Sequence, residues 1–228
     1  FSPAGKRPEA ITDDSKVLSQ DPENRQAMLG RGLNYAGDNQ RQLAQKDFEQ
    51  ALKTGPSKSG AAYLELGILR EKEGKYKEAI DNFTKAIEAS GKDADGYAYR
   101  GQVFSRIGDY RTAALNFTRA LELRPDDAGD LFNRGYARIQ SGNYQQAIDD
   151  LNRAVSLDPA NALAFGNRGY AWQQTGNYTQ AIQDYSRALS LKPEQETADY
   201  RRHYPDVRLD LVVQQYKPFF IYFNRGIS

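Results

Sequence analysis

Residues 128–161 read AGDLFNRGYARIQSGNYQQAIDDLNRAVSLDPAN, and residues 162–195 read ALAFGNRGYAWQQTGNYTQAIQDYSRALSLKPEQ. Laid over each other without a gap, the two stretches share Asn-Arg-Gly-Tyr-Ala, then Gly-Asn-Tyr, then Ala-Ile, at an offset of 34 residues. Identity at a fixed offset of this size is the sequence signature of a repeat architecture. We therefore expect these residues to form two consecutive copies of one structural unit.

The same register extends toward the N-terminus and gives five repeats, 25–58, 60–93, 94–127, 128–161 and 162–195, with Ser59 as a single insertion. Position 8 of the repeat is always glycine: Gly32, Gly67, Gly101, Gly135 and Gly169. Position 24 is always bulky: Phe48, Phe83, Phe117, Leu151 and Tyr185. Positions 20 and 27 are always alanine. Columns this regular indicate that the same packing contacts recur in every repeat.

Each repeat holds two amphipathic stretches, at about positions 1–14 and 18–31, which predict two helices. Glycine at position 15 and proline at position 32 are expected to end them. Small residues at positions 8, 20 and 27 predict a close approach of the two helices, and bulky residues at positions 4 and 24 fill the space between them. The first repeat has Asn39 and Arg41 where glycine and tyrosine are usual, which predicts a looser turn there.

This pattern resembles the tetratricopeptide repeat (TPR) family, and the resemblance covers residues 25–195. It implies an all-α fold, a right-handed α-solenoid of antiparallel helix pairs whose concave face is lined by the first helix of each pair. It also implies a non-catalytic role in protein–protein interaction, since solenoids of this kind present extended binding surfaces.

Composition argues against several other functions. The chain of 228 residues has 31 Lys plus Arg against 30 Asp plus Glu, so a formal net charge of +1 gives no electrostatic basis for nucleic-acid binding. No apolar run approaches the roughly 20 residues that cross a bilayer, so we expect no membrane insertion. With no cysteine, one histidine and no phosphate-binding glycine motif, we expect no catalytic residues, no metal site, no cofactor and no enzymatic activity.

The segments that flank the five repeats are harder to interpret. Residues 1–24 resemble the second helix of a partial repeat, although Asp14 and Val17 fit poorly at positions 24 and 27. Residues 196–217 are expected to form a capping helix and a linker. Within them, 204–217 includes a stretch that fits either a strand or a helix, and the helix is favoured because a lone strand would have no partner.

Residues 218–228 resemble the first helix of a half-repeat, with Gly226 at position 8. In that register Ser228 falls at position 10 and Phe1 at position 11, so joining them would complete one repeat with residues 1–24. Three explanations stay open: a rearranged chain order, a permutation or head-to-tail self-association through the two segments, and coincidence.

The family resemblance also places candidate ligand contacts, because the concave face of a TPR solenoid is built mainly from positions 2, 5, 6, 9, 12 and 13. The last three repeats carry aromatic and amide side chains there, which offer apolar area and hydrogen bonds to a peptide backbone. The candidate peptide-binding residues are Tyr99, Gln102, Arg106, Phe132, Asn133, Tyr136, Gln140, Asn167, Tyr170 and Gln174.

Structural roles compete with binding at some of these positions. Asn133 and Asn167 match an asparagine that holds peptide backbone in some TPR families, but either can instead cap or hydrate its helix. Tyr136 and Tyr170 can pack between repeats. The lysine and asparagine pattern with which other TPR proteins clamp a terminal carboxylate is absent. The arginines at position 7 are expected to be structural: Arg31, Arg100, Arg134 and Arg168, paired with acids such as Asp149, Asp150 and Asp184.

We therefore expect a scaffold that binds an extended peptide or a partner protein in the concave groove. Two alternatives stay open: the TPR arm of a larger bacterial envelope assembly or secretion protein, and a head-to-tail self-assembling module. The cysteine-free, glutamine-rich composition favours an exported, periplasmic bacterial protein, with the cytoplasm as the alternative.

Overall fold

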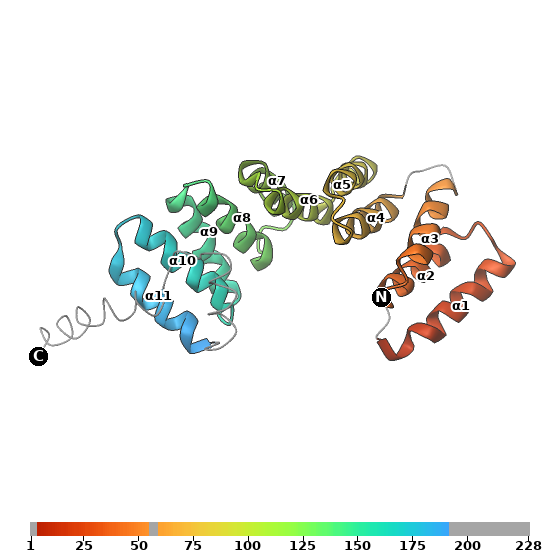
Figure 1. The fold of residues 1–228 in the computed structure, drawn as a ribbon, viewed down its shortest axis with the longest axis horizontal. Coiled ribbons are helices and arrows are strands. Elements are labelled where there is room, and N and C mark those ends of the chain that lie inside the picture. The colour runs from red at the N-terminus through yellow and green to blue at the C-terminus, as the bar shows by residue number, and fades with distance from the viewer. Residues whose placement is uncertain (1–3, 55–58, 192–228) are drawn as a thin grey trace, which may run out of the picture. The chain divides into compact units, whose positions relative to one another are not determined.

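The computed structural model describes residues 4–54 and 59–191, and every regular element within those residues is helical (Figure 1). The elements are η1 (Ala4–Lys6), α1 (Arg7–Gln20), α2 (Arg25–Gly37), α3 (Arg41–Lys53), α4 (Gly60–Lys72), α5 (Tyr76–Ser90), α6 (Ala94–Arg106), α7 (Tyr110–Leu123), α8 (Ala128–Gln140), α9 (Tyr144–Leu157), α10 (Ala162–Gln174) and α11 (Tyr178–Leu191). Helices that follow one another in the chain pack as successive pairs, so the predicted all-α solenoid class is confirmed.

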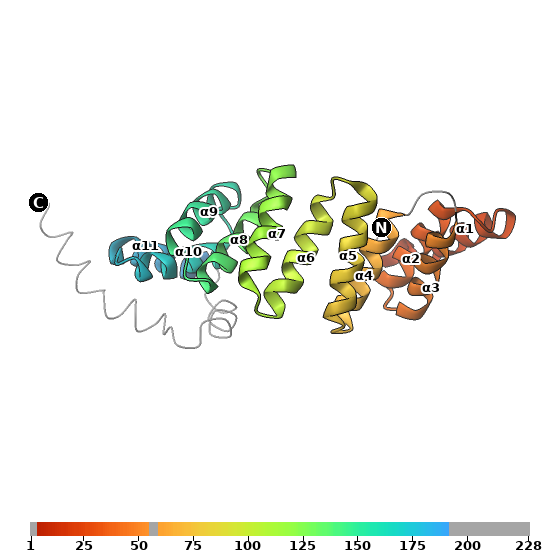
Figure 2. The same cartoon turned by 90° about the horizontal axis from the view of Figure 1, so that it is seen from above.

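We call α2, α4, α6, α8 and α10 the first helices, and α1, α3, α5, α7, α9 and α11 the second helices. The chain divides into two compact units, one holding α1–α7 and the other α8–α11. Within each compact unit the helices run back and forth beside their chain neighbours (Figure 2). First helices also contact one another across pairs: α2 with α4 and α4 with α6 in the first compact unit, and α8 with α10 in the second. The first helices therefore line one side of each compact unit.

Short polar residues begin all five first helices. A side-chain oxygen of the residue before the helix accepts a hydrogen bond from the backbone N–H three residues later, at Asn24, Ser59, Asp93, Asp127 and Asn161. Such caps satisfy one of the backbone donors that a helix start leaves unpaired. Ser59, the one inserted residue between repeats, is thus the N-cap of α4.

The turn between α2 and α3 is as tight as the others. Asn39 has a φ of 60°, in the left-handed region that glycine occupies at this position in the other four complete pairs. The Gln40 N–H donates to the Tyr35 carbonyl at 2.8 Å, and the equivalent Lys75 N–H donates to the Arg70 carbonyl at 2.9 Å. The expectation of a looser turn is wrong, because asparagine tolerates the left-handed conformation better than most side chains.

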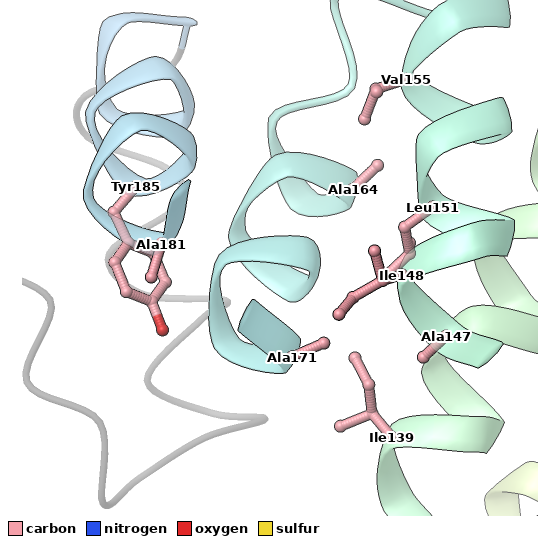
Figure 3. Packing of buried hydrophobic residues seen from close by; sticks show 9 residues of the cluster. All are labelled: Ile139, Ala147, Ile148, Leu151, Val155, Ala164, Ala171, Ala181 and Tyr185. Atoms are coloured by element: carbon pink, nitrogen blue, oxygen red, sulfur yellow. The ribbon is translucent and has the colours of Figure 1, made fainter. Parts of the chain in front are cut away.

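The core of each pair forms where the glycine at position 8 faces the bulky residue at position 24. A Cβ added to Gly67 would lie 2.5 Å from the Phe83 ring, and one added to Gly135 would lie 2.8 Å from Leu151. Phe83 and Leu151 are themselves fully buried. The predicted close approach is confirmed, since a larger residue at position 8 would displace the second helix. Figure 3 shows the core of the second compact unit, where side chains of α9 and α10 point toward one another.

The segments outside the five pairs are described only in part. Helix α1 lies inside residues 1–24, where the sequence predicts a second helix. The expectations for residues 196–217 and 218–228, including a join between Ser228 and Phe1, fall outside the described residues.

Candidate functional site

The arginines at position 7 hold the two helices of a pair together. Arg31 donates from Nε and Nη2 to the two carboxylate oxygens of Asp47, at 2.8 Å each. Arg168 makes the same bidentate contact with Asp184, at 2.7 and 2.6 Å. Burial raises the pKa of Asp184, and the Arg168 hydrogen bond opposes that shift. The predicted structural role is confirmed, because bidentate charge-assisted pairs fix geometry as well as adding stability. The predicted acidic partner is wrong for Arg100, whose Nε donates to Asn116 Oδ1 at 2.8 Å, because position 23 of its repeat is an asparagine.

The same guanidinium groups reach the second helix of the preceding pair. These contacts run from Arg31 Nη1 to Ser15 Oγ (3.1 Å), from Arg100 Nη1 to Thr84 Oγ1 (2.9 Å) and from Arg168 Nη1 to Asn152 Oδ1 (2.9 Å). One side chain therefore joins three helices and fixes the rotation of the first helix about its axis. That rotation decides which residues the first helix presents on its open side.

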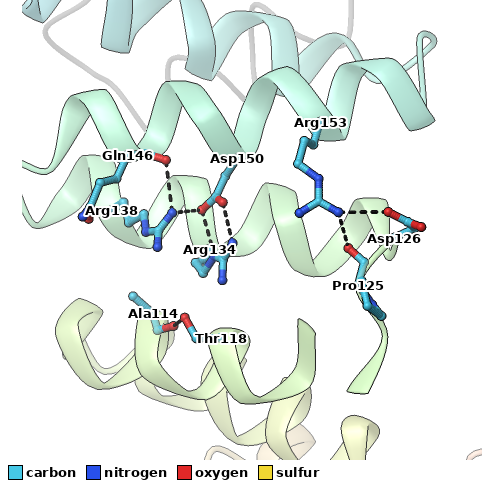
Figure 4. Close-up of polar contacts among 9 residues, drawn as sticks. All are labelled: Ala114, Thr118, Pro125, Asp126, Arg134, Arg138, Gln146, Asp150 and Arg153. Carbon is cyan, nitrogen blue, oxygen red and sulfur yellow. Dashed lines mark hydrogen bonds and ion pairs between the residues drawn. The ribbon is translucent and has the colours of Figure 1, made fainter. Parts of the chain in front are cut away.

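Asp150 binds a second arginine in addition to the one at position 7 (Figure 4). It accepts hydrogen bonds from Arg134 at 2.9 and 2.6 Å and from Arg138 at 2.6 Å, and Arg138 also donates to the Gln146 carbonyl at 3.1 Å. Burial lowers the pKa of Arg138, although the neighbouring Asp150 opposes this shift. Asp149 is exposed, so the phase of α9 selects Asp150 rather than its neighbour.

In the first compact unit, three of the sequence-predicted residues come together. Tyr99, Gln102 and Arg106 lie on one side of α6 and line a pocket of about 590 Å³. The pocket is completed by Ile68, Glu71, Lys72, Glu73, Gly74 and Tyr76. Arg106 Nε donates to Glu71 Oε1 at 2.7 Å, and the Tyr99 ring stacks on Phe83 with centroids 5.7 Å apart. The pocket therefore combines an aromatic ring, an amide and an ion pair.

The sequence-based prediction missed the residues of α4 on this side: Ile68 and Glu71, which line the pocket, and Glu65, one turn before them on α4. Glu65, Ile68 and Glu71 occupy positions 6, 9 and 12 of the second repeat, but the concave positions were projected only onto the last three repeats. Extending the same columns by one repeat would have found them. Burial raises the pKa of Glu65, and Lys72 opposes the shift. We call the following residues the α4–α6 face: Glu65, Ile68, Glu71, Tyr99, Gln102 and Arg106.

The spacing of Tyr99, Gln102 and Arg106 on α6 recurs twice in the second compact unit. It recurs in Asn133, Tyr136 and Gln140, and again in Asn167, Tyr170 and Gln174. This spacing places them on one side of a helix. We call the following residues the α8–α10 face: Phe132, Asn133, Tyr136 and Gln140 on α8, and Asn167, Tyr170 and Gln174 on α10. None of the seven is Asp, Glu, Lys or Arg. The structure thus divides the predicted residues between two faces of different chemistry.

Core packing accounts for part of the aromatic area of the α8–α10 face. Phe132, Tyr136 and Tyr170 are partly buried against the core of the compact unit. Tyr170 also meets Tyr144 edge-on, with ring centroids 6.3 Å apart. Each of these rings therefore contributes to packing with one part of its surface and to the α8–α10 face with another.

The amide side chains of this face differ in their surroundings. Asn167 is buried, and its Nδ2 donates to the Leu163 carbonyl of the same helix at 2.8 Å. Asn133, at the equivalent position, is half-buried and has no hydrogen-bond partner within the described part of the chain. Gln140 is half-buried and Gln174 is exposed. Asn133, Gln140 and Gln174 are therefore the amides of this face whose hydrogen-bonding groups a ligand can satisfy.

Across residues 4–54 and 59–191, no group of three or more His, Cys, Asp or Glu side chains is placed to hold a metal ion. None of the helices described combines the length and the apolar content that crossing a membrane requires.

A sequence model described as tetratricopeptide repeat matches residues 32–94, 100–161 and 132–196, which together make up more than half of the chain. The chain belongs to the tetratricopeptide repeat family. TPR proteins form a family of non-catalytic scaffolds for protein–protein interaction, and this part of the predicted function is confirmed.

One curated relative of this TPR protein is a probable UDP-N-acetylglucosamine–peptide N-acetylglucosaminyltransferase, SPINDLY, from Solanum lycopersicum. The two are 30% identical over 81 residues, which is 36% of this chain and 9% of the plant protein. The match therefore spans a small part of that protein.

Solved structures of other TPR proteins share the fold. YrrB, described as a TPR protein with an unusual peptide-binding site, has a TM-score of 0.71 and 23% identity, covering 83% of this chain and 97% of its own. The C-terminal part of a TPR protein from Cytophaga hutchinsonii has a TM-score of 0.70 and 19% identity, covering 96% and 84%. MamA from Desulfovibrio magneticus has a TM-score of 0.68 and 16% identity, covering 75% and 97%. At these identities the likeness extends to the fold alone.

Proposed function

We propose that this TPR protein binds an extended peptide segment of a partner protein on the open side of its first helices. The observation that carries the proposal is the surroundings of Asn133. Its half-buried amide has no partner within the described residues, and it lies in an uncharged row of aromatic and amide side chains. A partly buried polar group is stabilised when a ligand supplies its hydrogen bonds.

The α8–α10 face suits a peptide backbone. An extended chain presents N–H and C=O groups in alternation, and a side-chain amide can donate to one while accepting from the other. Asn133 and Gln140 offer such amides from α8, and Gln174 offers one from α10. Tyr136 and Tyr170 add apolar contact area at a small cost in conformational entropy. Because the face holds no charged residue, it suits apolar or uncharged ligand side chains.

The α4–α6 face suits a basic ligand side chain. Together with the other residues that line the pocket, it has three carboxylates, Glu65, Glu71 and Glu73, against two cations, Lys72 and Arg106. The ion pair between Arg106 and Glu71 lines the pocket, and Glu65 adds a carboxylate whose charge burial disfavours. A lysine or arginine of the ligand would relieve that cost by pairing with the carboxylate.

The comparisons give general support to this proposal. YrrB has the same fold and is described as having a peptide-binding site. The family to which the chain belongs serves protein–protein interaction.

The test uses displayed peptides, because no partner is specified by the chemistry. Random peptides on phage are selected on the whole chain, and enriched sequences are synthesised and titrated by calorimetry. For peptides that bind the α8–α10 face, replacing Asn133 and Gln140 together by Ala is expected to weaken binding about tenfold, or about 1.4 kcal/mol. Asn167 is left unchanged, because its bond within α10 makes its loss a question of stability.

The matched control is Gln145→Ala, which removes an exposed amide from the second helix α9. It is expected to leave affinity unchanged. The proposal fails if no peptide is enriched, or if every enriched peptide binds the double variant as tightly as the original chain. Equal losses in the control and in the double variant would place binding on the second helices and would also contradict it.

A further inference from the structure

One carboxylate of the pocket on the α4–α6 face is held by a single hydrogen bond. The Glu71 side chain is 11% exposed, and its Oε1 accepts from Arg106 Nε at 2.7 Å. This is the only hydrogen bond that Arg106 makes to the described part of the chain, although a guanidinium carries five N–H donors. The Arg106 side chain is 61% exposed. A largely buried carboxylate is therefore paired with a long cation that stays mostly in water.

The other charged groups of the pocket lining offer less to a ligand. Glu73 pairs with Arg70 and Lys75 at 2.9 Å each, and the Lys75 hydrogen bond lowers the pKa of Glu73. Lys72 is exposed to water, which screens its charge. Glu71 lies in the last turn of α4, where the helix dipole disfavours a negative charge and makes a cationic partner valuable. Glu71 is therefore the carboxylate of the pocket that a ligand cation can bind.

Two tyrosine rings line the pocket together with this ion pair. Tyr99 on α6 is held by stacking on Phe83, and Tyr76 is the first residue of α5. A guanidinium packs favourably over an aromatic ring and can bind both oxygens of a carboxylate at once. The ammonium group of lysine is a compact point charge that lacks this planar geometry. The pocket therefore suits an arginine side chain better than a lysine.

We propose that this pocket is a subsite for an arginine side chain of the bound peptide, and that Arg106 occupies Glu71 until the ligand displaces it. The inference rests on the proposed function and assigns one ligand residue to the α4–α6 face. Displacement costs little, because an ion pair with an exposed partner contributes little and the released Arg106 is hydrated. The ligand gains the second carboxylate oxygen of Glu71, to which Arg106 donates no hydrogen bond.

The sign of the Arg106 effect tests the displacement. The probe is a short alanine peptide with a central arginine, capped at both ends and titrated into the whole chain. Arg106→Ala is expected to raise its affinity about twofold to fivefold, because the competing ion pair is gone. Glu71→Gln is expected to lower the affinity at least about tenfold. The matched control, Arg111→Ala, removes an exposed arginine from the second helix α7 and should leave the affinity unchanged. Weaker binding by Arg106→Ala would make Arg106 a ligand contact and would overturn the proposal.

The Nε–H resonance of Arg106 reports the displacement itself, and its loss in Arg106→Ala assigns it in the 15N-labelled chain. The arginine peptide should move this signal toward its position in Glu71→Gln, where the ion pair is absent. Binding that leaves the signal in place, or no binding of the arginine peptide, would overturn the proposal. If displayed peptides still bind through Asn133 and Gln140 in that case, the proposed function stands and the arginine subsite alone is wrong. If neither kind of peptide binds, both are wrong.

Discussion

The α4–α6 face presents Glu65, Glu71 and Arg106, whereas the α8–α10 face presents no charged residue at the same repeat positions. The packing beneath the two faces is nevertheless the same, since Gly67 faces Phe83 in one compact unit as Gly135 faces Leu151 in the other. Helix packing therefore fixes the residues between the helices and leaves the open positions of the first helices unconstrained. The two faces therefore differ in the ligand side chains that each one suits.

Individual repeats also differ in what joins the two helices of a pair. The second compact unit uses Arg134 with Asp150, whereas the second repeat has Leu66 and Asn82 at the same two positions. Leu66 is buried, and Asn82 donates to the Glu78 carbonyl of its own helix. A buried ion pair and an apolar residue are thus alternative solutions at one site, as expected when desolvation offsets most of the attraction between two buried charges.

The largest expected effect tests the difference between a repeat joined by an ion pair and a repeat without one. Asp150→Ala leaves Arg134 and Arg138 without their shared carboxylate, so we expect the free energy of unfolding to fall by about 3 kcal/mol. Asn82→Ala at the equivalent position should cost less than about 0.5 kcal/mol. Urea denaturation followed by circular dichroism measures both. Equal losses of stability in the two variants would show that the ion pair is not what distinguishes these repeats. The double variant Arg134→Leu with Asp150→Asn should recover at least half of the stability that Asp150→Ala loses.

A smaller effect tests whether the packing is shared. Gly67→Ala and Gly135→Ala should each destabilise the fold by about 1–2 kcal/mol, because the added methyl group overlaps the residue at position 24. Gly129→Ala on α8 adds a methyl group whose one near neighbour is Asp127 Oδ1 at 3.3 Å. It should therefore be neutral, or stabilising by up to about 1 kcal/mol. The shared-packing interpretation is wrong if Gly135→Ala and Gly129→Ala melt at the same temperature.

A third prediction sharpens the difference between the faces. Peptides whose binding depends on Glu65 and Glu71 should lose about threefold to tenfold in affinity when salt is raised from low to high ionic strength, because salt screens exposed charges. Peptides whose binding depends on Asn133 and Gln140 should change less than about twofold. Calorimetric titrations at the two salt concentrations measure this. Equal salt dependence for both classes would contradict the assignment of charge to one face.

The smallest expected effect concerns pH. Burial raises the pKa of Glu65 above its value in the unfolded chain, so its ionised form reduces stability near neutral pH. That cost disappears as the pH falls through the raised pKa and then below the ordinary value of about 4.3. Glu65→Gln should therefore raise the melting temperature by about 2 °C near pH 7 and by progressively less toward pH 4. A gain that stays constant with pH would mean that desolvation of the charge is not its cause.

The repeat columns could predict the features that depend on packing within a pair. Glycine at position 8 opposite a bulky residue at position 24 has one physical explanation, and Gly67 with Phe83 shows it. The structural role of Arg168 and its partner Asp184 could be predicted as well. The prediction of a looser turn at Asn39 was wrong. Position 15 of the repeat requires a left-handed backbone conformation, and asparagine adopts it as glycine does.

The sequence could predict which repeat positions form the binding faces, but not how deeply each residue at those positions is buried. Asn133 and Asn167 are equivalent in sequence, yet one is half-buried and the other fully buried. Burial at position 6 depends on what the adjacent pairs contribute, and a single column does not contain that information. The half-buried Glu65 was missed for a different reason, since the pattern was not carried into its repeat.

The side-chain amide resonances of the chain test the central claim most directly, because they report on the proposed contacts themselves. When an enriched peptide that depends on Asn133 is added to the 15N-labelled protein, the NH2 signals of Asn133, Gln140 and Gln174 should shift. Those of Gln145 and Gln180, exposed on the second helices, should stay in place. Shifts confined to Gln145 and Gln180, or no shift of the three first-helix amides at saturating peptide, would contradict a peptide-binding α8–α10 face.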